Sequence, residues 1–326
     1  MDMAPTSPSV GGAATSGAAL NGPQALTLRE LIDEYMRAYV GRDRSRGSRL
    51  ARWQALLGDR LAHTITDDDV FAALEQLALE PARKYAGRDV EGRPVLRAGA
   101  TPRTPSTINR YHASLGAVYT WAIRRRRIPK GTVHPCRQIA LNSEPAGRIR
   151  FLADDERTRL LAACRRSAWP RMYALVLLAI TTGARRGELE ALTWGDIDLV
   201  RAVARVKNSK NGEPRVLPLV PTVVAELEAF KPGASERLVF ASARRPRKVM
   251  VWWKYWQQAL AESGISDFRF HDLRHCCASY LAQSGASILE IGDVLGHRTL
   301  RMTQRYAHLT VGTKAALVNR VLGDIR

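Results

Sequence analysis

Cationic side chains and one candidate nucleophile recur in a fixed order through the second half of the sequence. They are Arg185, His271, Arg274, His297 and Tyr306. Guanidinium groups bind phosphate oxygens in bidentate fashion and have no proton to lose, so two arginines can neutralise the charge that develops on a phosphodiester in its transition state. A tyrosine hydroxyl can attack phosphorus and hold the strand as a covalent ester. Together these residue types indicate phosphodiester cleavage through a covalent intermediate.

Local sequence patterns predict the elements that carry the first arginine. The almost uninterrupted apolar run 172–180 predicts a buried helix, which Gly183 ends, so Arg185 lies where a second short helix begins. Glu188 follows three residues later and has two interpretations. It either holds an arginine or histidine in place, or forms one member of a surface helix pair. We keep Glu188 as a supporting residue of the site.

A β-hairpin is predicted after this pair of helices. Residues 198–206 alternate between apolar and polar side chains, the Asn-Gly pair at 211–212 is typical of a type I′ turn, and 215–219 predicts the return strand. Two lysines, Lys207 and Lys210, lie on this hairpin close to the turn. The hairpin would therefore bring a lysine to the site.

The last third of the sequence predicts three consecutive helical segments. His271 and Arg274 share one face of the first, because residues three apart on a helix are neighbours. Gly296 ends the second segment directly before His297, and the third carries Tyr306. Each candidate residue is thus placed at a helix end or on one helix face.

The ordered set of Arg, Lys, His-x-x-Arg, Gly-His and Tyr resembles the active site of tyrosine recombinases of the phage integrase family. The resemblance covers nearly the whole chain after residue 24. It implies a site-specific DNA recombinase that cleaves and rejoins strands through a 3′-phosphotyrosyl intermediate and a Holliday junction. The tyrosyl ester conserves the bond energy, so neither ATP nor Mg²⁺ nor another cofactor is implied.

The same resemblance implies a role for each residue of the site. Tyr306 attacks phosphorus, and His271 assists proton transfer. Lys210 protonates the leaving 5′ oxygen, because its place before the hairpin turn matches the family better than that of Lys207. The residues that stabilise the phosphorane are Arg185, Arg274 and His297.

A metal site is the alternative for the same stretch, because His271 and His275 have the i,i+4 spacing of zinc-binding helices. Arg274 lies on the same turn, and no glutamate stands between the histidines as in His-Glu-x-x-His. The adjacent Cys276 and Cys277 do not form a Cys-x-x-Cys pair. The other cysteines are Cys136 and Cys164. We therefore expect no metal ion.

Composition favours a polyanionic partner. The 326 residues have a formal net charge of +19, with a sequence pI of about 10.5. This charge alone does not separate DNA from RNA or an anionic membrane. No apolar run is long enough to span a bilayer, and the Ala/Gly/Ser/Pro-rich start lacks the features of a signal peptide. We expect a cytoplasmic protein that binds double-stranded DNA and no membrane.

The fold class expected from these patterns is mainly α with a small β-sheet. Helix caps and apolar spacing from residue 27 onward predict a helical domain, which resembles the all-helical, SAM-like core-binding domain of the family. A mixed α/β catalytic domain would follow. The expected segments are a disordered tail at 1–23, the helical domain at 24–142 with a basic insertion at 81–105, a linker at 143–150 and the catalytic domain at 151–326. The insertion is either a basic loop over the DNA backbone or, as we favour, disordered.

The end of the chain carries an apolar stripe at helical spacing. It consists of Val318, Val321, Leu322 and Ile325. This stripe packs either on its own domain or, as the resemblance implies, on a neighbouring protomer in a homotetramer on DNA. The resemblance also allows accessory DNA-bending or directionality factors as partners.

Two other functions fit part of the pattern. A type IB topoisomerase uses similar chemistry as a monomer, and a catalytically inactive DNA-binding regulator would keep the charge without the site. The integrase-like spacing and the apolar stripe disfavour the first, and the full set of catalytic residue types disfavours the second.

Overall fold

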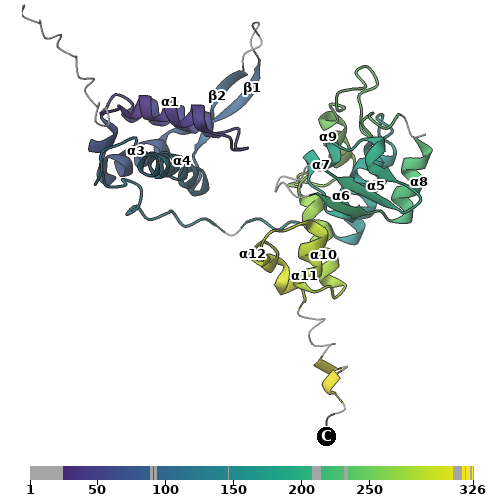
Figure 1. The fold of residues 1–326 in the computed structure, drawn as a ribbon. Coiled ribbons are helices and arrows are strands. Elements are labelled where there is room, and N and C mark those ends of the chain that lie inside the picture. The colour runs from purple at the N-terminus through teal and green to yellow at the C-terminus, as the bar shows by residue number, and fades with distance from the viewer. Residues whose placement is uncertain are drawn as a thin grey trace, which may run out of the picture. The chain divides into compact units, whose positions relative to one another are not determined.

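The chain divides into two compact units, Met1–Ala146 and Gly147–Arg326. The computed structural model describes residues 25–88, 91, 94–145, 147–207, 214–230, 234–310, 318–319, 321–323 and 325 (Figure 1). The tail expected at 1–23 and the hairpin turn with Lys210 lie outside the described residues.

The first unit is built from helices around one apolar core. Thr27 and Glu30 form a capping box at the first helix, as the sequence predicts, and Thr66 and Asp69 form another. The indole of Trp53 is buried and donates to the Tyr111 carbonyl oxygen at 3.0 Å, which joins two of the helices. The helical elements are α1 (Leu28–Ala38), α2 (Arg46–Leu57), η1 (Ala62–Thr64), α3 (Asp67–Leu79) and α4 (Pro105–Arg124).

The insertion forms an antiparallel ribbon, so the expectation of a disordered segment is wrong. Strand β1 (Pro81–Arg88) pairs with β2 (Pro94–Pro102), and Figure 1 shows the ribbon projecting from the helices. Arg103 anchors its base: Nη1 donates to the Leu77 carbonyl oxygen at 2.7 Å, and Nη2 pairs with Glu80 at 3.1 Å. Hydrogen bonds between the two strands satisfy the backbone polar groups, so the ribbon forms without an apolar core of its own. The Gly- and Pro-rich composition of the segment gave no sign of this pairing.

The second unit surrounds the apolar helix α6 and carries a small antiparallel sheet. The strand order is β3-β4-β5, with Val203 opposite Pro218 and Val206 opposite Arg215. The elements are α5 (Asp154–Arg165), α6 (Met172–Thr182), α7 (Arg186–Glu190), η2 (Trp194–Asp196), β3 (Ile197–Asp198), β4 (Val203–Val206), β5 (Arg215–Pro218), α8 (Pro221–Ala229), α9 (Trp253–Glu262), α10 (Asp272–Gln283), α11 (Ile288–Leu295), α12 (Leu300–Thr303) and η3 (Gln304–Thr310).

Helix α6 confirms the buried helix predicted at 172–180 and organises the second core. It packs against α5 and α10, and Leu175 and Leu178 are fully buried. A smaller apolar cluster joins α10, α11 and η3, and contains Leu295 and Tyr306. The helix that carries His-x-x-Arg is therefore fixed between two cores.

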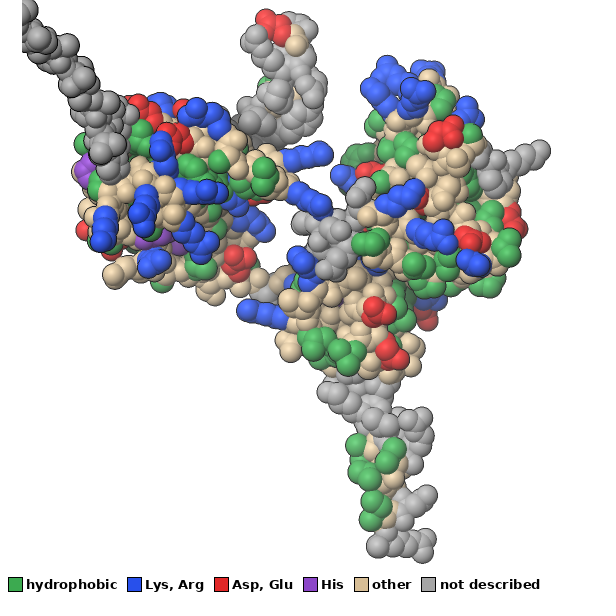
Figure 2. All heavy atoms as spheres, viewed as in Figure 1, with side chains coloured by type: hydrophobic (Ala, Val, Ile, Leu, Met, Phe, Trp, Pro, Cys, Tyr) green, Lys and Arg blue, Asp and Glu red, His purple; other side chains and the backbone are tan. Residues whose placement is uncertain are grey.

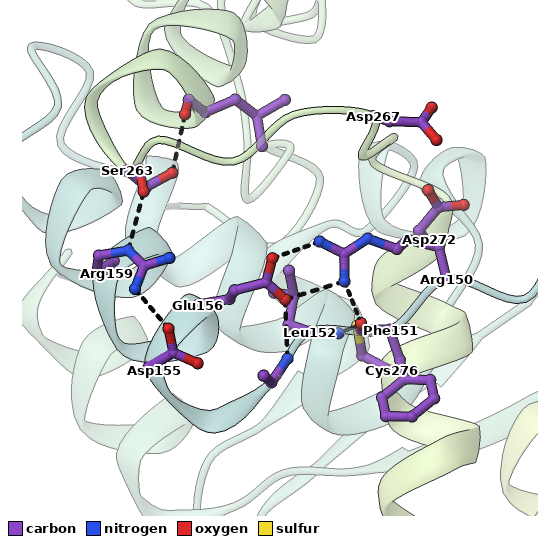
Figure 3. Close-up of polar contacts among 12 residues, drawn as sticks. Arg150, Phe151, Leu152, Asp155, Glu156, Arg159, Ser263, Asp267, Asp272 and Cys276 are labelled. Carbon is purple, nitrogen blue, oxygen red and sulfur yellow. Dashed lines mark hydrogen bonds and ion pairs between the residues drawn. The ribbon is translucent and has the colours of Figure 1, made fainter.

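Polar contacts at the start of the second unit fasten the chain to α5 and α10 (Figure 3). Arg150 Nη1 lies 2.9 Å from Glu156 Oε2, and the same carboxylate accepts from the Ala153 backbone at 3.0 Å. The backbone N–H of Leu152 donates to Cys276 Sγ at 3.3 Å. These contacts hold α10 against the first segment of the unit, which precedes α5.

Candidate active site

Arg185 is the N-cap residue of α7 and lies three residues after the end of α6. Gly183 has φ 60°, a left-handed conformation that suits glycine, and it ends α6 as the sequence predicts. Arg185 then donates twice to Glu188: its backbone N lies 2.9 Å from Oε2, and Nη1 lies 2.8 Å from Oε1. Arg185 is thus held at the helix start by a carboxylate three residues away.

Glu188 is buried, with 3 % of its side chain exposed, so the interpretation as a surface helix pair is wrong. Burial raises the pKa of this carboxyl, but hydrogen bonds from Arg215 and from the Arg185 backbone outweigh it and hold the pKa below its ordinary value. Glu188 therefore stays ionised at neutral pH. It is the anion around which two arginines are arranged.

Arg215 is a residue of this cluster that the sequence analysis treated only as the start of a strand. Its Nη2 lies 2.7 Å from Glu188 Oε2. The two residues are 27 positions apart, and no local spacing links them. The Asn-Gly turn and the strand that follows it could have signalled only that Arg215 lies at the base of the hairpin.

Arg274 lies on the first turn of α10 and is 5 % exposed. Its Nη1 donates to the Gly183 carbonyl oxygen at 2.6 Å, while the buried Nη2 has no hydrogen-bond partner within the part of the chain that the structure describes. Burial, and then the charges of Arg185 and Arg215, lower the pKa of Arg274 to about 10. An anion would satisfy Nη2 and offset this repulsion.

The histidine of the Gly-His motif, His297, lies beside the same arginines. Gly296 ends α11 with φ 64°, and His297 Nδ1 then lies 2.8 Å from the hydroxyl of the buried Thr303. Burial, followed by the charges of Arg274 and Arg185, lowers the pKa of His297 to about 4. His297 is therefore neutral at pH 7. A Thr303 hydroxyl that donates to Nδ1 leaves the proton on Nε2, where it can be donated to a phosphate oxygen.

Tyr306 lies in η3 and is 2 % exposed. Its hydroxyl oxygen is 2.5 Å from His275 Nδ1. Burial raises the pKa of Tyr306 to about 12, against the opposing charges of Arg305 and Arg274. Burial likewise lowers the pKa of His275 to about 4. The contact is therefore a hydrogen bond that a protonated tyrosine donates to a neutral histidine.

The His-x-x-Arg motif separates into an exposed and a buried side chain. His271 caps α10 and is exposed, and its ring lies 5.5 Å from the ring of His275. His275 is 9 % exposed, and the sequence analysis noted it only for its metal-like spacing. The structure thus brings His271 next to the residue that holds the tyrosine. No group of side chains suited to a metal ion is found among the described residues.

The two candidate lysines differ in what the structure describes. Lys207 is 70 % exposed and forms an ion pair with Asp196 at 2.6 Å. Lys210 lies within 208–213, outside the described residues, and its assignment stays a prediction.

The site has more positive than negative side chains. Arg185 and Arg215 pair with Glu188, and the charges of both arginines act on Arg274 and His297. Such an arrangement binds an anion of at least one negative charge. A phosphodiester has that charge and the oxygens that guanidinium groups recognise.

Comparison with known families identifies the class of protein. The model of the phage integrase family matches residues 150–312, which is half of the chain. The chain belongs to the phage integrase family. The match spans α5 to η3 and includes every candidate site residue named above.

Individual relatives are similar over different lengths. The integrase of Salmonella phage P22 is 34 % identical over 176 residues, which are 50 % of this chain and 44 % of that protein. The shufflon-specific DNA recombinase of Escherichia coli is 29 % identical over 225 residues, 68 % and 56 % of the two chains. The chain thus spans about half the length of these two relatives. Tyrosine recombinase XerC of Roseiflexus castenholzii is 28 % identical over 277 residues, 81 % and 77 %.

Solved structures show the same fold. The Tn1549 transposon integrase in complex with a circular intermediate DNA has a TM-score of 0.68 and 17 % identity, covering 91 % of this chain and 100 % of that one. A lambda integrase dimer bound to a COC′ core site has a TM-score of 0.62 and 22 % identity, covering 86 % and 95 %. These matches, with the helical content, confirm the expected fold class: mainly α with a small sheet, ending in a tyrosine recombinase catalytic domain.

Proposed function

We propose that this protein is a site-specific DNA recombinase that cleaves and rejoins double-stranded DNA through a 3′-phosphotyrosyl intermediate. The observation that carries the proposal is the buried Arg274, whose Nη2 lacks a hydrogen-bond partner within the described residues, next to Arg185 and His297. A scissile phosphate would satisfy that donor. Catalysis by such a site is electrostatic, because the donors are in place before the charge develops.

The steps of cleavage follow from the residues present. Tyr306 Oη forms a bond to phosphorus while the bond to the 5′ oxygen breaks. Arg185, Arg274 and His297 stabilise the phosphorane, Lys210 gives a proton to the leaving oxygen, and His271 assists the transfer of the tyrosine proton. The ester is conserved, so attack by a 5′ hydroxyl reverses these steps and rejoins the strand. Two such exchanges would pass through a Holliday junction.

Tyr306 must move before it can attack. Its hydroxyl is buried and hydrogen-bonded to His275, so no phosphate reaches it in the arrangement described. Binding of DNA would release the hydroxyl toward the arginines. The cations there would then lower a pKa that burial has raised to about 12.

The partner is DNA with a specific recombination site. Lys and Arg side chains are spread over the surface of both units (Figure 2), in accord with the net charge of +19. The helical unit at 24–142 would bind the core of that site and the unit from 151 would cut it, in the cytoplasm. No described helix is long and apolar enough to cross a membrane.

Assembly on DNA would use the end of the chain. Four apolar side chains there are exposed by 50–72 %: Val318, Val321, Leu322 and Ile325. Burying each such side chain stabilises an assembly by about 1.5–3 kcal/mol. We propose that this stripe docks on a neighbouring protomer in a homotetramer, with accessory factors setting the direction of exchange.

A nicked half-site substrate, whose cleaved end diffuses away, tests the function. The half-site sequence is taken from the recombination site mapped next to the gene that encodes this protein. The wild type should accumulate a covalent protein–DNA complex, whereas Tyr306→Phe should bind the same DNA and form none. Tyr280→Phe is the matched control, because Tyr280 is a partly buried tyrosine of the same unit and donates to the Leu152 carbonyl oxygen at 2.9 Å.

Supercoiled plasmid without the site distinguishes the alternatives. A recombinase should leave it supercoiled, while relaxation independent of sequence would support a type IB topoisomerase. A covalent complex formed by Tyr306→Phe would overturn the assignment of the nucleophile. Tight binding with no covalent complex in the wild type would support an inactive regulator.

A further inference from the structure

Arg215 makes contacts to two separate parts of the candidate active site. Its Nη2 lies 2.7 Å from Glu188 Oε2, and its Nη1 lies 2.7 Å from the carbonyl oxygen of Val294, on the last turn of α11. The side chain is 12 % exposed. One buried guanidinium thus links the carboxylate that holds Arg185 to the helix end that precedes His297.

The end of α11 is built to accommodate this side chain. Gly296 has φ 64°, and a Cβ atom added there would lie 2.9 Å from Arg215 Cδ. Another residue would therefore meet both an unfavourable backbone conformation and the stem of Arg215. The turn that carries His297 and the side chain of Arg215 fit each other only with glycine at 296.

The place of Arg215 in the sequence adds a third connection. It is the first residue of β5 and lies five positions after Lys210 in the sequence. Val206, its cross-strand partner, is buried in the core of the unit. The β4–β5 strand pair is therefore connected to Glu188 and to α11 through Arg215.

We propose that Arg215 is a positioning residue, which fixes Arg185, His297 and the β4–β5 strand pair relative to one another. This inference rests on the proposed function. Both Nη atoms of Arg215 donate to protein acceptors, so the side chain links Glu188 to the end of α11, while its buried Nε has no hydrogen-bond partner among the described residues. Arg215 acts through its contacts with the Glu188 carboxylate and the Val294 carbonyl oxygen.

An arginine is required because its two Nη donors point in fixed, divergent directions. A lysine could neutralise Glu188 but would not also reach the Val294 carbonyl oxygen in the same geometry. A glutamine would leave the buried Glu188 paired with Arg185 alone, and the Val294 carbonyl oxygen without its donor. Both changes favour a rearrangement of the site. Displacement of a reacting group by about 1 Å can cost about 100-fold in rate.

The test compares Arg215→Gln and Arg215→Lys with the wild type in single-turnover cleavage of the nicked half-site. Arg215→Gln should slow cleavage about 100-fold while half-site affinity changes less than about threefold, and Arg215→Lys should recover part of the rate. Arg205→Gln is the matched control, because it removes the same charge from an exposed position on the neighbouring strand β4. It should leave the cleavage rate of bound DNA unchanged.

The double variant Arg215→Gln with Glu188→Gln isolates the contact. Because it removes the orphaned buried charge, it should lose less rate than the two single changes multiplied together. Loss equal to the product would show that the two residues act independently and would overturn the inference. Arg215→Gln that cleaves as fast as the wild type, or that loses affinity and rate in equal measure, would overturn it as well.

Titration of His297 by NMR gives a readout that needs no DNA, with Arg215→Lys as the variant that keeps the charge. The charge of Arg215 contributes to the lowered pKa of His297. The pKa should rise in Arg215→Gln and stay near its wild-type value in Arg215→Lys, with the resonance identified by its loss in His297→Gln. An unchanged His297 pKa in Arg215→Gln would refute the contact of Arg215 with the end of α11 in solution. Absence of covalent complex in the wild type would instead count against the proposed function itself.

Discussion

The two halves of the candidate active site are held in opposite ways. In the arginine half, Arg185 and Arg215 pair with the buried Glu188, and Arg274 keeps one Nη atom without a partner among the described residues. In the tyrosine half, the hydroxyl of Tyr306 is already occupied by His275 at 2.5 Å. The groups that would bind the phosphate are ready, whereas the nucleophile is withheld. DNA binding therefore has to change the tyrosine half far more than the arginine half.

Loss of an arginine from the first half should have the largest effect. Arg185→Ala removes a charge-assisted donor from a buried site and should slow cleavage by about 100-fold or more, with half-site affinity nearly unchanged. Single-turnover rates and binding isotherms on the same half-site measure this. Arg186→Ala is the control, because Arg186 is 59 % exposed and one residue away. Cleavage by Arg185→Ala near the wild-type rate would mean that this half is not prepared for the phosphate.

A change in the tyrosine half should have a smaller effect of opposite sign. His275→Phe removes the acceptor that retains Tyr306, and a hydrogen bond contributes about 0.5–1.5 kcal/mol. Covalent complex should therefore form about 2- to 10-fold faster on the nicked half-site. His275→Gln, which keeps an acceptor, should lie between this variant and the wild type.

The opposite result would give His275 a different role. If His275→Phe slows cleavage more than about 10-fold while its thermal unfolding matches the wild type, His275 takes part in the chemistry of the bound complex. The tyrosine half would then be poised and not withheld.

Acid should weaken the folded unit through both halves, with the smallest effect. His297 and His275 have pKa values of about 4 in the folded protein, below the ordinary value of 6.5. Between these values the unfolded chain binds protons that the folded one does not, so stability is fully present above pH 6.5 and falls as the pH decreases toward 4. The loss in melting temperature from pH 7 to pH 5 should be smaller for His275→Phe than for the wild type. An equal loss in both would show that His275 is not buried in its neutral form.

The sequence predicted those parts of the site that local spacing encodes. Arg185 follows a helix that glycine ends, and His297 follows another, so breaks in the apolar pattern located both. His275 and Arg215 were missed because their partners are distant: Tyr306 is 31 positions from His275, and Val294 is 79 positions from Arg215. Such contacts depend on how the elements pack, which single-sequence periodicity does not specify.

The fold shows the same division. The apolar run at 172–180 and the capping box at Thr27 each appear as expected, because burial pattern and cap chemistry are local. The ribbon at 81–102 was not predicted, since its pairing joins Pro81 to Pro102 across a Gly- and Arg-rich segment. Arg103, which anchors the ribbon, contacts the carbonyl oxygen of Leu77, 26 positions away in the sequence.

Tyr306 is expected to become covalently joined to DNA. The complex trapped on the nicked half-site can be digested with protease and nuclease, and the peptide that carries the residual nucleotide can be sequenced by mass spectrometry. The account predicts a single adduct, in the peptide that contains Tyr306, joined through a 3′ phosphate. An adduct on any other residue, or one joined through a 5′ phosphate, would contradict it.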